Sequence, residues 1–163
     1  MEFHPGVIDG VIWRPLTKYH DGRGWLCELF RHDELPVEFH PVMAYISMTE
    51  PGVARGPHEH IDQSDCFCFL GPSNFKVYLW DHRKGSPTFG ARQTDVVGAD
   101  KPALLVIPPG VVHAYKNVGA EQGIVFNCPN RLYKGWNRKG WIPGQGVDEI
   151  RHEDDADNRF RLD

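Results

Sequence analysis

Glycine and proline interrupt this chain at short intervals, and no long helix fits between them. The sequence has 17 glycines and 13 prolines in 163 residues, and short apolar runs without a sustained 3.6-residue period lie between them. This pattern is typical of an all-β sandwich or barrel, in which turns connect short strands. The runs predict strands at residues 7–14, 24–31, 42–49, 52–60, 65–70, 74–82, 88–97, 103–107, 112–117 and 123–128.

The length of the chain predicts a single domain over residues 1–163, because it suits one hydrophobic core. We expect the barrel to occupy about residues 6–130. An aromatic and basic loop follows, with Tyr133, Trp136 and Trp141 as its large side chains. That loop is either a plain surface segment or one wall of a site. Acidic and basic residues alternate from Asp148 onward, and we expect this polar tail to remain solvated.

Charge and cysteine content exclude several functional classes. A net charge of −4 without a basic stripe argues against binding to nucleic acid or to an anionic membrane. No apolar run approaches the length of a membrane span, and we expect no signal peptide. The cysteines lie in apolar runs without CxxC spacing, so we expect buried thiols and a cytoplasmic location. They are Cys27, Cys66, Cys68 and Cys128.

A polar, titratable cluster occupies residues 52–65. His58 and His60 are two positions apart, so an extended strand would place both side chains on one face. Arg55 and Gln63 flank the pair, and an apolar run follows directly. We interpret the cluster as an inward-facing site. The alternative is a pair of exposed histidines at a sheet edge.

A second cluster, at residues 107–117, contributes His113. In a small barrel, inward-facing residues from separate strands converge near an open mouth. Three imidazoles there support two chemistries. One is a divalent-metal site with open positions for substrate. The other is metal-free proton transfer, in which one histidine removes a proton and a second group returns one.

The two clusters together resemble the two sequence motifs of the cupin superfamily. The matching residues are Gly56-x-His58-x-His60 and Pro108-x-Gly110-x-x-His113-x-x-x-Asn117. The metal-binding version adds a glutamate a few residues after the second histidine, and the nearest candidates here are Gln63 and Asp65. A metal-binding cupin would use His58, His60, Asp65 and His113 as its ligands.

Further motifs are similar to those of the dTDP-4-dehydrorhamnose 3,5-epimerase family over about residues 6–135. They are Asp21-x-Arg23-Gly24, Gly52-Val-x-Arg55-Gly-x-His58, Asp81-x-Arg83-x-Gly85-Ser86-Pro87-Thr88-Phe89-Gly90, Ile107-Pro-x-Gly-x-x-His113, Asn127-Cys-Pro and Tyr133. The resemblance implies a metal-free cupin jelly-roll barrel that needs no cofactor and acts on nucleotide-linked 4-keto-6-deoxyhexoses. It also implies a homodimer that exchanges an N-terminal strand.

By this resemblance, His58 is the base that removes a proton next to the C4 ketone. Tyr133 is the acid that returns a proton to the opposite face, and His113 lines the same pocket. Arg23 and Arg55 would face the diphosphate or the enolate oxygen, since a guanidinium can hold anionic oxygens with two hydrogen bonds. The alternatives are a surface aromatic for Tyr133 and a solvated turn arginine for Arg23.

The chain departs from the epimerase pattern beside its histidines. Asp65 stands where the family has a lysine, and an anion there would oppose an enolate. Met43 and Tyr45 stand where the family has glutamine and asparagine. The family's base is oriented by a C-terminal aspartate, and the candidates for it here are Asp148, Asp154, Asp155 and Asp157.

The segment Arg55-Gly56-x-His58-x-His60 also resembles the sugar 3,4-ketoisomerases. These cupins use a His-x-His pair to move protons between C3 and C4 of a dTDP-linked 4-keto-6-deoxyglucose. Tyr45 is placed like a tyrosine of their site. The run 85–90, by contrast, belongs to the epimerase pattern.

The N-terminal residues 6–13 are apolar and β-branched, with Pro5 before them and Pro15 two residues after. Left unpaired, such a strand would expose a sheet edge, which soluble proteins avoid. We expect it to pair in the sheet of a partner subunit and to bring Arg23 toward that subunit's ligand.

These observations predict a cytoplasmic, metal-independent cupin homodimer. It would epimerise a nucleotide-linked 4-keto-6-deoxyhexose, with dTDP as the expected nucleotide, at C3, C5 or both. His58 and Tyr133 would be catalytic, and the substrate-binding residues would be Arg23, Arg55, His60, Gln63, His113 and Tyr45. The alternatives are a 3,4-ketoisomerase, a divalent-metal cupin enzyme and a non-catalytic sugar-binding cupin.

Overall fold

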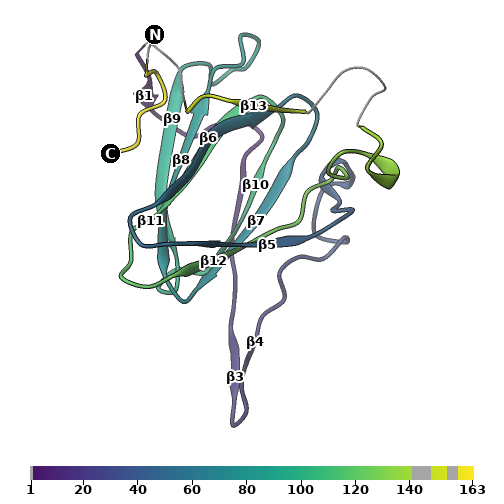
Figure 1. Ribbon diagram of the computed structural model, residues 1–163, viewed down its shortest axis with the longest axis vertical. Coiled ribbons are helices and arrows are strands. Elements are labelled where there is room, and N and C mark those ends of the chain that lie inside the picture. The colour runs from purple at the N-terminus through teal and green to yellow at the C-terminus, as the bar shows by residue number, and fades with distance from the viewer. Residues whose placement is uncertain (1, 141–147, 154–157) are drawn as a thin grey trace.

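The computed structural model describes residues 2–140, 148–153 and 158–163, and its regular structure is almost entirely β (Figure 1). A six-stranded sheet has the order β1 (His4–Pro5), β9 (Ala91–Gly98), β8 (Asn74–Asp81), β11 (Val111–Asn117), β6 (Ala54–His60) and β13 (Glu149–Arg151). A five-stranded sheet has the order β2 (Ile12–Pro15), β10 (Ala103–Ile107), β7 (Asp65–Gly71), β12 (Gly123–Asn127) and β5 (Tyr45–Thr49). A separate hairpin consists of β3 (Tyr19–Asp21) and β4 (Gly24–Leu26). The helical segments in the described residues are two short 3-10 turns, η1 (Val37–Phe39) and η2 (Trp136–Arg138).

The predicted all-β architecture is confirmed, and the strands β5 to β12 fall within a few residues of the predicted runs. Every described strand pairing is antiparallel except the short one between β1 and β9. Two predicted runs are only partly strand: residues 7–14, where the strand is Ile12–Pro15, and residues 24–31, where only Gly24–Leu26 forms a strand. The remainder of the second run crosses the outer face of the five-stranded sheet, where Leu29 and Phe30 pack against a buried apolar cluster.

The two central strands of the five-stranded sheet are apolar on both faces because both faces are covered. In β7, Phe67 and Phe69 face the core between the sheets, while Cys66 and Cys68 face the cluster under residues 29–39. Side chains alternate between the faces of a strand, so this double burial accounts for the unbroken apolar run that the sequence shows there. Cys66, Cys68 and Cys128 are buried free thiols, as predicted, whereas Cys27 is only half-buried.

The polar C-terminal tail is not simply solvated, so that expectation was wrong. Glu149–Arg151 forms β13 and pairs with β6. Farther along, Phe160 is 4% exposed and packs against Trp80 on the outer face of the six-stranded sheet. The charge pattern did not predict this burial because one phenylalanine and one three-residue strand leave no periodic signal.

The expectation for the N-terminal segment also needs correction. Ile12–Pro15 pairs with β10 of its own chain, and Ile8 is buried in the core between the sheets. The segment therefore finds its hydrogen-bond partners without a second subunit. Its apolar residues were predicted to need a sheet edge, and the edge that β10 offers in the same chain satisfies that need.

The hairpin β3–β4 extends away from the barrel (Figure 1). Its aromatic and aliphatic side chains are at least half exposed, as they are for Tyr19, Trp25 and Leu26. The edge strand β5 also exposes apolar side chains, with Ile46 61% and Met48 45% exposed. Within the described residues, no helix is long and apolar enough to cross a membrane.

Candidate active site

The histidines of β6 and β11 meet between the two sheets. His58 and His60 project to one side of β6, and Glu59 projects to the other, as alternation along a strand requires. His113 lies opposite His58 in the strand pairing, and their ring centroids are 4.3 Å apart. The His60 ring lies 5.6 Å from that of His58 and 5.9 Å from that of His113. The structure therefore brings the three predicted imidazoles together.

The close approach of these strands depends on Gly56. Its φ is +82°, and a Cβ atom at this position would lie 2.5 Å from the carbonyl oxygen of His113. Glycine alone tolerates both the left-handed backbone and the contact. The glycine of the first cupin-like motif thus sets the distance between His58 and His113.

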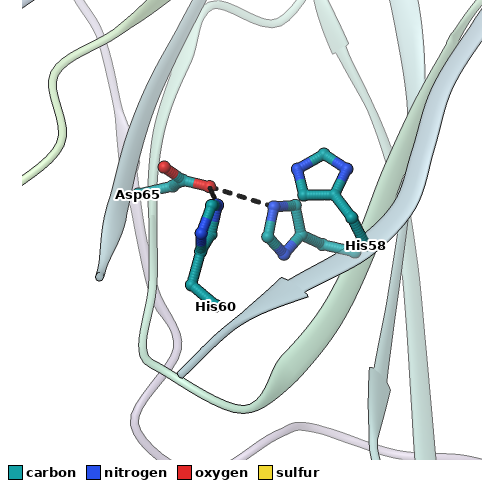
Figure 2. A group of neighbouring side chains, drawn as sticks. His58, His60 and Asp65 are labelled. Carbon is teal, nitrogen blue, oxygen red and sulfur yellow. Dashed lines mark ion pairs between the residues drawn. The ribbon is translucent and has the colours of Figure 1, made fainter. Parts of the chain in front are cut away.

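Asp65, at the start of β7, is a buried anion beside the histidines (Figure 2). Its Oδ1 accepts hydrogen bonds of 2.9 Å from the side-chain amides of Gln63 and Asn127. Its Oδ2 lies 3.2 Å from His60 Nε2 and 3.0 Å from His113 Nε2. Burial alone would raise the pKa of Asp65, but the neighbouring imidazoles of His113 and His60 outweigh it and hold the pKa well below its ordinary value. The residue is therefore ionised.

The ring nitrogen of His113 that faces Asp65 is Nε2, and in the neutral ring this nitrogen carries no proton. The His113 Nδ1 lies 3.0 Å from the carbonyl oxygen of Val111, which can only accept, so the first ring proton belongs on Nδ1. The lone pair of Nε2 then faces Asp65 Oδ2. Neither of these buried atoms has a well-directed hydrogen bond among the described residues. Two buried acceptors only 3.0 Å apart repel, so a cation between them would be stabilised by both.

His60 lies between two carboxylates. Its Nδ1 is 3.1 Å from Asp148 Oδ2, and its Nε2 is 3.2 Å from Asp65 Oδ2. Burial would lower the pKa of His60, but Asp65 and Asp148 outweigh it and raise the pKa above its ordinary value. These two carboxylates therefore favour a positive charge on His60.

His58 has the opposite tendency. Burial and the neighbouring His113 lower its pKa to about 2, so the ring is neutral and keeps a free lone pair. Among the described residues, the carboxylate that forms an ion-pair contact with it is that of Glu149, whose Oε1 lies 4.0 Å from His58 Nδ1. Asp148 contacts His60 and not His58. The other three candidates for an orienting aspartate, Asp154, Asp155 and Asp157, lie outside the described residues.

His58 and His60 line a pocket of about 870 Å³, a size typical of small-molecule sites. Residues of β5, β6, β7 and β11, the segment around η2 and the β13 region form its walls. They include Met43, Tyr45, Ser47, Arg55, Gln63, Phe67, Tyr115, Tyr133, Lys134, Arg138, Asp148, Glu149 and Arg151. His113 is 2% exposed and lies behind His58, outside this lining.

Three tyrosines, Tyr45, Tyr115 and Tyr133, line the pocket. Tyr133 is half-exposed, and its backbone N–H lies 3.2 Å from the sulfur of Met43. The hydroxyl of Tyr45 accepts a 2.8 Å hydrogen bond from Asn127, which also donates to Asp65. Burial and the charge of Asp65 raise the pKa of Tyr45, so its hydroxyl keeps its proton and can donate it in a hydrogen bond to a ligand.

The two predicted arginines differ in their surroundings. Arg55 lines the pocket, but its guanidinium already donates to Thr49 Oγ1 at 3.0 Å and to the carbonyl oxygen of Met48 at 2.7 Å. Arg23 lies at the turn of the β3–β4 hairpin, with 91% of its side chain exposed, and pairs with Asp21. Arg23 is not in the pocket of its own chain, and a role there would require a second subunit.

The run 85–90, the most specific part of the epimerase-like pattern, lies outside the pocket lining. It forms a turn around the fully buried Asp81, which accepts hydrogen bonds from Arg83, Ser86 and Thr88. Burial would raise the pKa of Asp81, but these donors outweigh it and lower the pKa. This motif is therefore structural.

Sequence reasoning missed several residues of the pocket. Phe67 and Tyr115 belong to predicted strands, and inward alternation could have placed them in the barrel interior. Glu149 and Arg151 carried no such signal, because β13 is too short and too polar to show a period. Lys134 and Arg138 lie in the loop that was left open as a possible site wall.

A model of the dTDP-4-dehydrorhamnose 3,5-epimerase family matches residues 6–143 of the chain. Two curated proteins are also similar. The "probable low-salt glycan biosynthesis epimerase" Agl13 of Haloferax volcanii is 39% identical over 131 residues, which are 79% of this chain and 82% of that protein. The spore coat polysaccharide biosynthesis protein SpsL of Bacillus subtilis is 40% identical over 113 residues, which are 69% of this chain and 74% of that protein.

Solved structures agree on the fold. A dTDP sugar isomerase from Desulfovibrio desulfuricans superposes with a TM-score of 0.78 at 23% identity, over 96% of this chain and 91% of that one. ChmJ, a 3'-monoepimerase of Streptomyces bikiniensis in complex with dTDP-quinovose, has a TM-score of 0.70 at 20% identity, over 91% of this chain and 72% of that one. The expected cupin jelly-roll fold is confirmed.

Proposed function

The chain belongs to the dTDP-4-dehydrorhamnose 3,5-epimerase family, and from that premise we propose how its pocket epimerises a nucleotide-linked sugar. The substrate is a nucleotide-diphosphate 4-keto-6-deoxyhexose, with dTDP as the nucleotide, and the reaction inverts C3, C5 or both. His58 removes the proton and Tyr133 returns one, without a metal ion. One observation carries the proposal: His58, whose pKa is lowered by its burial, lies beside His60, whose pKa is raised by Asp65 and Asp148, in a pocket of about 870 Å³.

Removal of the proton needs a lone pair close to an acidified C–H bond. The C4 ketone acidifies the hydrogens at C3 and C5, so a positioned imidazole can remove either one and leave an enolate. His58 is unprotonated in its buried position, and Glu149 lies on its Nδ1 side. As His58 takes up the proton, this carboxylate stabilises the imidazolium that forms.

The enolate needs positive charge nearby, and Asp65 stands where the family has a lysine. The contacts of Asp65 support another source of positive charge. Its Oδ2 lies beside His60 and His113, and its charge raises the pKa of His60. A protonated His60 in the pocket wall supplies a cation near the reacting carbons, where charge stabilisation is effective in a site shielded from water.

Return of the proton to the opposite face needs a second acid. Tyr133 lines the same pocket from the loop after β12, which separates it from the strand that carries His58. The diphosphate would bind the cations at the rim, Lys134, Arg138 and Arg151. ChmJ is in complex with dTDP-quinovose in its crystal structure, which supports a dTDP-linked substrate here.

Solvent deuterium tests the proposal. The enzyme is incubated in D₂O with a dTDP-linked 4-keto-6-deoxyglucose, and NMR follows C3 and C5. We expect deuterium at one or both carbons of an inverted product. In Tyr133→Phe, exchange on the original face should persist while net inversion falls. A Tyr133→Phe enzyme that inverts at the wild-type rate would remove Tyr133 from the acid role, and no exchange with any dTDP-linked 4-keto sugar would refute the epimerase reaction on this substrate class.

Two rival activities acting through the same residues would give different products. A 3,4-ketoisomerase would move the carbonyl from C4 to C3 and exchange deuterium at C3 and C4. A non-catalytic sugar-binding cupin would raise its melting temperature with the ligand and exchange nothing. The NMR spectrum of one reaction mixture distinguishes all three.

A specific observation favours a metal-dependent enzyme as the second candidate. One donor atom from each of His58, His60, Asp65 and His113 can be chosen so that all four lie within 4.8 Å of one another. Two of these atoms, Asp65 Oδ2 and His113 Nε2, are buried without a well-directed hydrogen bond. Nitrogen and carboxylate donors of this kind suit a divalent transition metal, which would act as a Lewis acid. Because His58 cannot both bind a metal and serve as the base, activity that is lost to a chelator and restored by one metal would decide for this candidate.

We also propose a two-fold dimer in the cytoplasm. The exposed apolar side chains of the β3–β4 hairpin and of the edge strand β5 suit a protein interface, since such edges are seldom left open. Arg23, at the turn of the hairpin, would then reach the ligand of the partner subunit. Light scattering of Leu26→Asp tests this: a monomeric variant supports the interface, and an unchanged mass contradicts it. The control substitution must be at an exposed position, which excludes a buried residue such as Leu105. Val118 is exposed, so Val118→Asp serves as the control, and the mass of this variant should equal that of wild type.

A further inference from the structure

The outer face of β6 carries a second cluster of metal-ligating side chains, separate from the pocket. Glu59 projects from β6 to the side opposite His58 and His60. There it meets His82, which follows β8, and His152, which follows β13. The three side chains come from distant parts of the chain, and none of the three residues lines the pocket.

The geometry of this cluster converges on one oxygen atom. His82 Nε2 and His152 Nε2 each lie 2.9 Å from Glu59 Oε1. One donor atom from each of the three residues can be chosen within 4.8 Å of the others. Ligands bound at about 2.1 Å from a divalent ion, with angles between octahedral and tetrahedral, lie about 3.0–3.4 Å from one another. The nitrogen-to-oxygen separations are close to the lower end of that range.

The surroundings of the cluster limit access by water. Only 10% of the side chains of Glu59 and His152 is exposed, and 30% of that of His82. Phe160 contacts both imidazole rings, with centroid distances of 5.5 Å to His82 and 4.8 Å to His152. Phe160 therefore forms one wall of the site. The site is open to solvent mainly beside His82, and an ion would enter there.

We propose that Glu59, His82 and His152 bind a divalent transition-metal ion, with zinc as the best match, at a site outside the pocket. Two imidazoles and one carboxylate form a donor set that zinc prefers, and its remaining positions would hold water. Hydrogen bonding alone would need a proton on both Nε2 atoms, whereas the ion takes both lone pairs. An ion bound there would accept both Nε2 lone pairs, and its positive charge would offset that of the buried Glu59 carboxylate.

The ion would fasten the C-terminal segment to the barrel. His152 directly follows β13, and its backbone N–H donates to the carbonyl oxygen of Pro57 on β6. The same short strand begins at Glu149, next to Asp148, and these two carboxylates contact His58 and His60 in the pocket. A metal ion on the outer face of β6 would thus keep β13 paired in register with β6. The segment that begins at Asp148 would then stay in contact with the inner histidines.

Zinc titration tests the proposal on untagged full-length protein, after treatment with a chelator and buffer exchange. Calorimetry counts the binding events in wild type, Glu59→Gln, His82→Asn and the matched inner variant His113→Asn. We expect His82→Asn and Glu59→Gln to lose one zinc event, or to weaken it at least 100-fold. His113→Asn should keep that event. Zinc should also slow proteolytic cleavage after residue 147 in wild type and in His113→Asn, but not in His82→Asn.

The conservative His82→Asn variant decides the matter, because this partly exposed position tolerates replacement even if Glu59→Gln fails to fold. Zinc affinity and stoichiometry in His82→Asn equal to those of wild type would overturn the proposal. A wild-type protein whose zinc events all vanish in His113→Asn would overturn it as well, because all zinc would then bind at the inner histidines. In either case the outer cluster is a set of hydrogen bonds only.

Discussion

Asp65 and Asp81 are both fully buried, and their environments lower the pKa of both carboxyl groups, yet their partners differ in kind. Asp81 is held by Arg83, Ser86 and Thr88, all within seven residues of it in the chain. Asp65 is held by Gln63 nearby and by residues of three other strands, one of which carries His113.

The difference shows how one residue type stabilises a turn in one place and sets protonation states in another. Arginine is permanently charged, so the Asp81 pair is a fixed element of structure. Histidine titrates near neutral pH, so the cluster around Asp65 can change its charge. The turn lies outside the pocket lining, whereas Asp65 adjoins it through Gln63 and His60.

The largest effect on activity should come from the pocket side. We expect His58→Asn to lower kcat/KM by about 10³-fold or more, a barrier increase of about 4 kcal/mol, because it removes the proposed base. The melting temperature should change little, since His58 is neutral and its loss leaves no buried charge without a partner. Circular dichroism and turnover measure the two effects, and activity within about tenfold of wild type would exclude His58 as the base.

The next largest effect should appear at the turn, and in stability. Asp81→Asn removes one partner of a buried ion pair and should cost about 3–5 kcal/mol of unfolding free energy. Because the folded-state pKa of Asp81 is lowered, its contribution is complete above the unfolded pKa of about 3.9 and is lost as the pH falls toward the folded value. The difference between variant and wild type should therefore be largest at neutral pH and shrink in acid.

Chemical denaturation at several pH values measures this loss. Turnover per folded molecule should stay at the wild-type level, because no residue of the turn lines the pocket. A stable Asp81→Asn enzyme with reduced kcat would contradict the assignment of a purely structural role to this turn.

Asp65→Asn should act on activity through His60, with a loss of about 10–100-fold, as is typical when a residue that supports a functional side chain is replaced. Without the carboxylate, the pKa of His60 should fall, and His60 should carry less positive charge at a given pH. In wild type, activity and the stability contributed by His60 should be complete below the unfolded pKa of about 6.5 and decline as the pH rises through the raised folded pKa. In the variant, that decline should begin at a lower pH.

NMR titration of the histidine rings, together with a pH–rate profile, tests this prediction. A His60 pKa that is unchanged in Asp65→Asn would show that Asp148 alone sets the charge of this ring. An unchanged alkaline limb of the rate profile would show that the charge of His60 does not take part in the reaction.

The smallest effect should come from an aspartate on the surface. Asp95 pairs with Lys101 at 2.5 Å, and both side chains are more than a third exposed. We expect Asp95→Asn to change the unfolding free energy by less than about 1 kcal/mol and to leave turnover unchanged, since water and salt screen such pairs. A larger loss of unfolding free energy in Asp95→Asn would mean that burial does not explain the larger effect expected for Asp81→Asn.

The sequence predicted the parts of the site that lie on regular strands. Alternation along β6 put His58 and His60 on one face, and the second motif supplied His113 opposite them. Tyr45, Gln63 and Tyr133 were also singled out, and all three line the pocket. These residues could be found because strand alternation and motif spacing are local properties, which a sequence displays directly.

Only the tertiary structure showed which charged groups of the site lie next to one another and which segment completes the pocket wall. Asp65 looked unfavourable as an anion until its contacts with His60 and His113 were known, because His113 is remote from it in sequence and His60, although only five residues away, lies on a strand of the other sheet. The polar segment around β13 gave no periodic signal, yet it supplies Asp148 and Glu149 to the pocket and His152 to the outer face. The pKa of a buried group depends on all its neighbours in space, and a linear sequence specifies only those beside it in the chain.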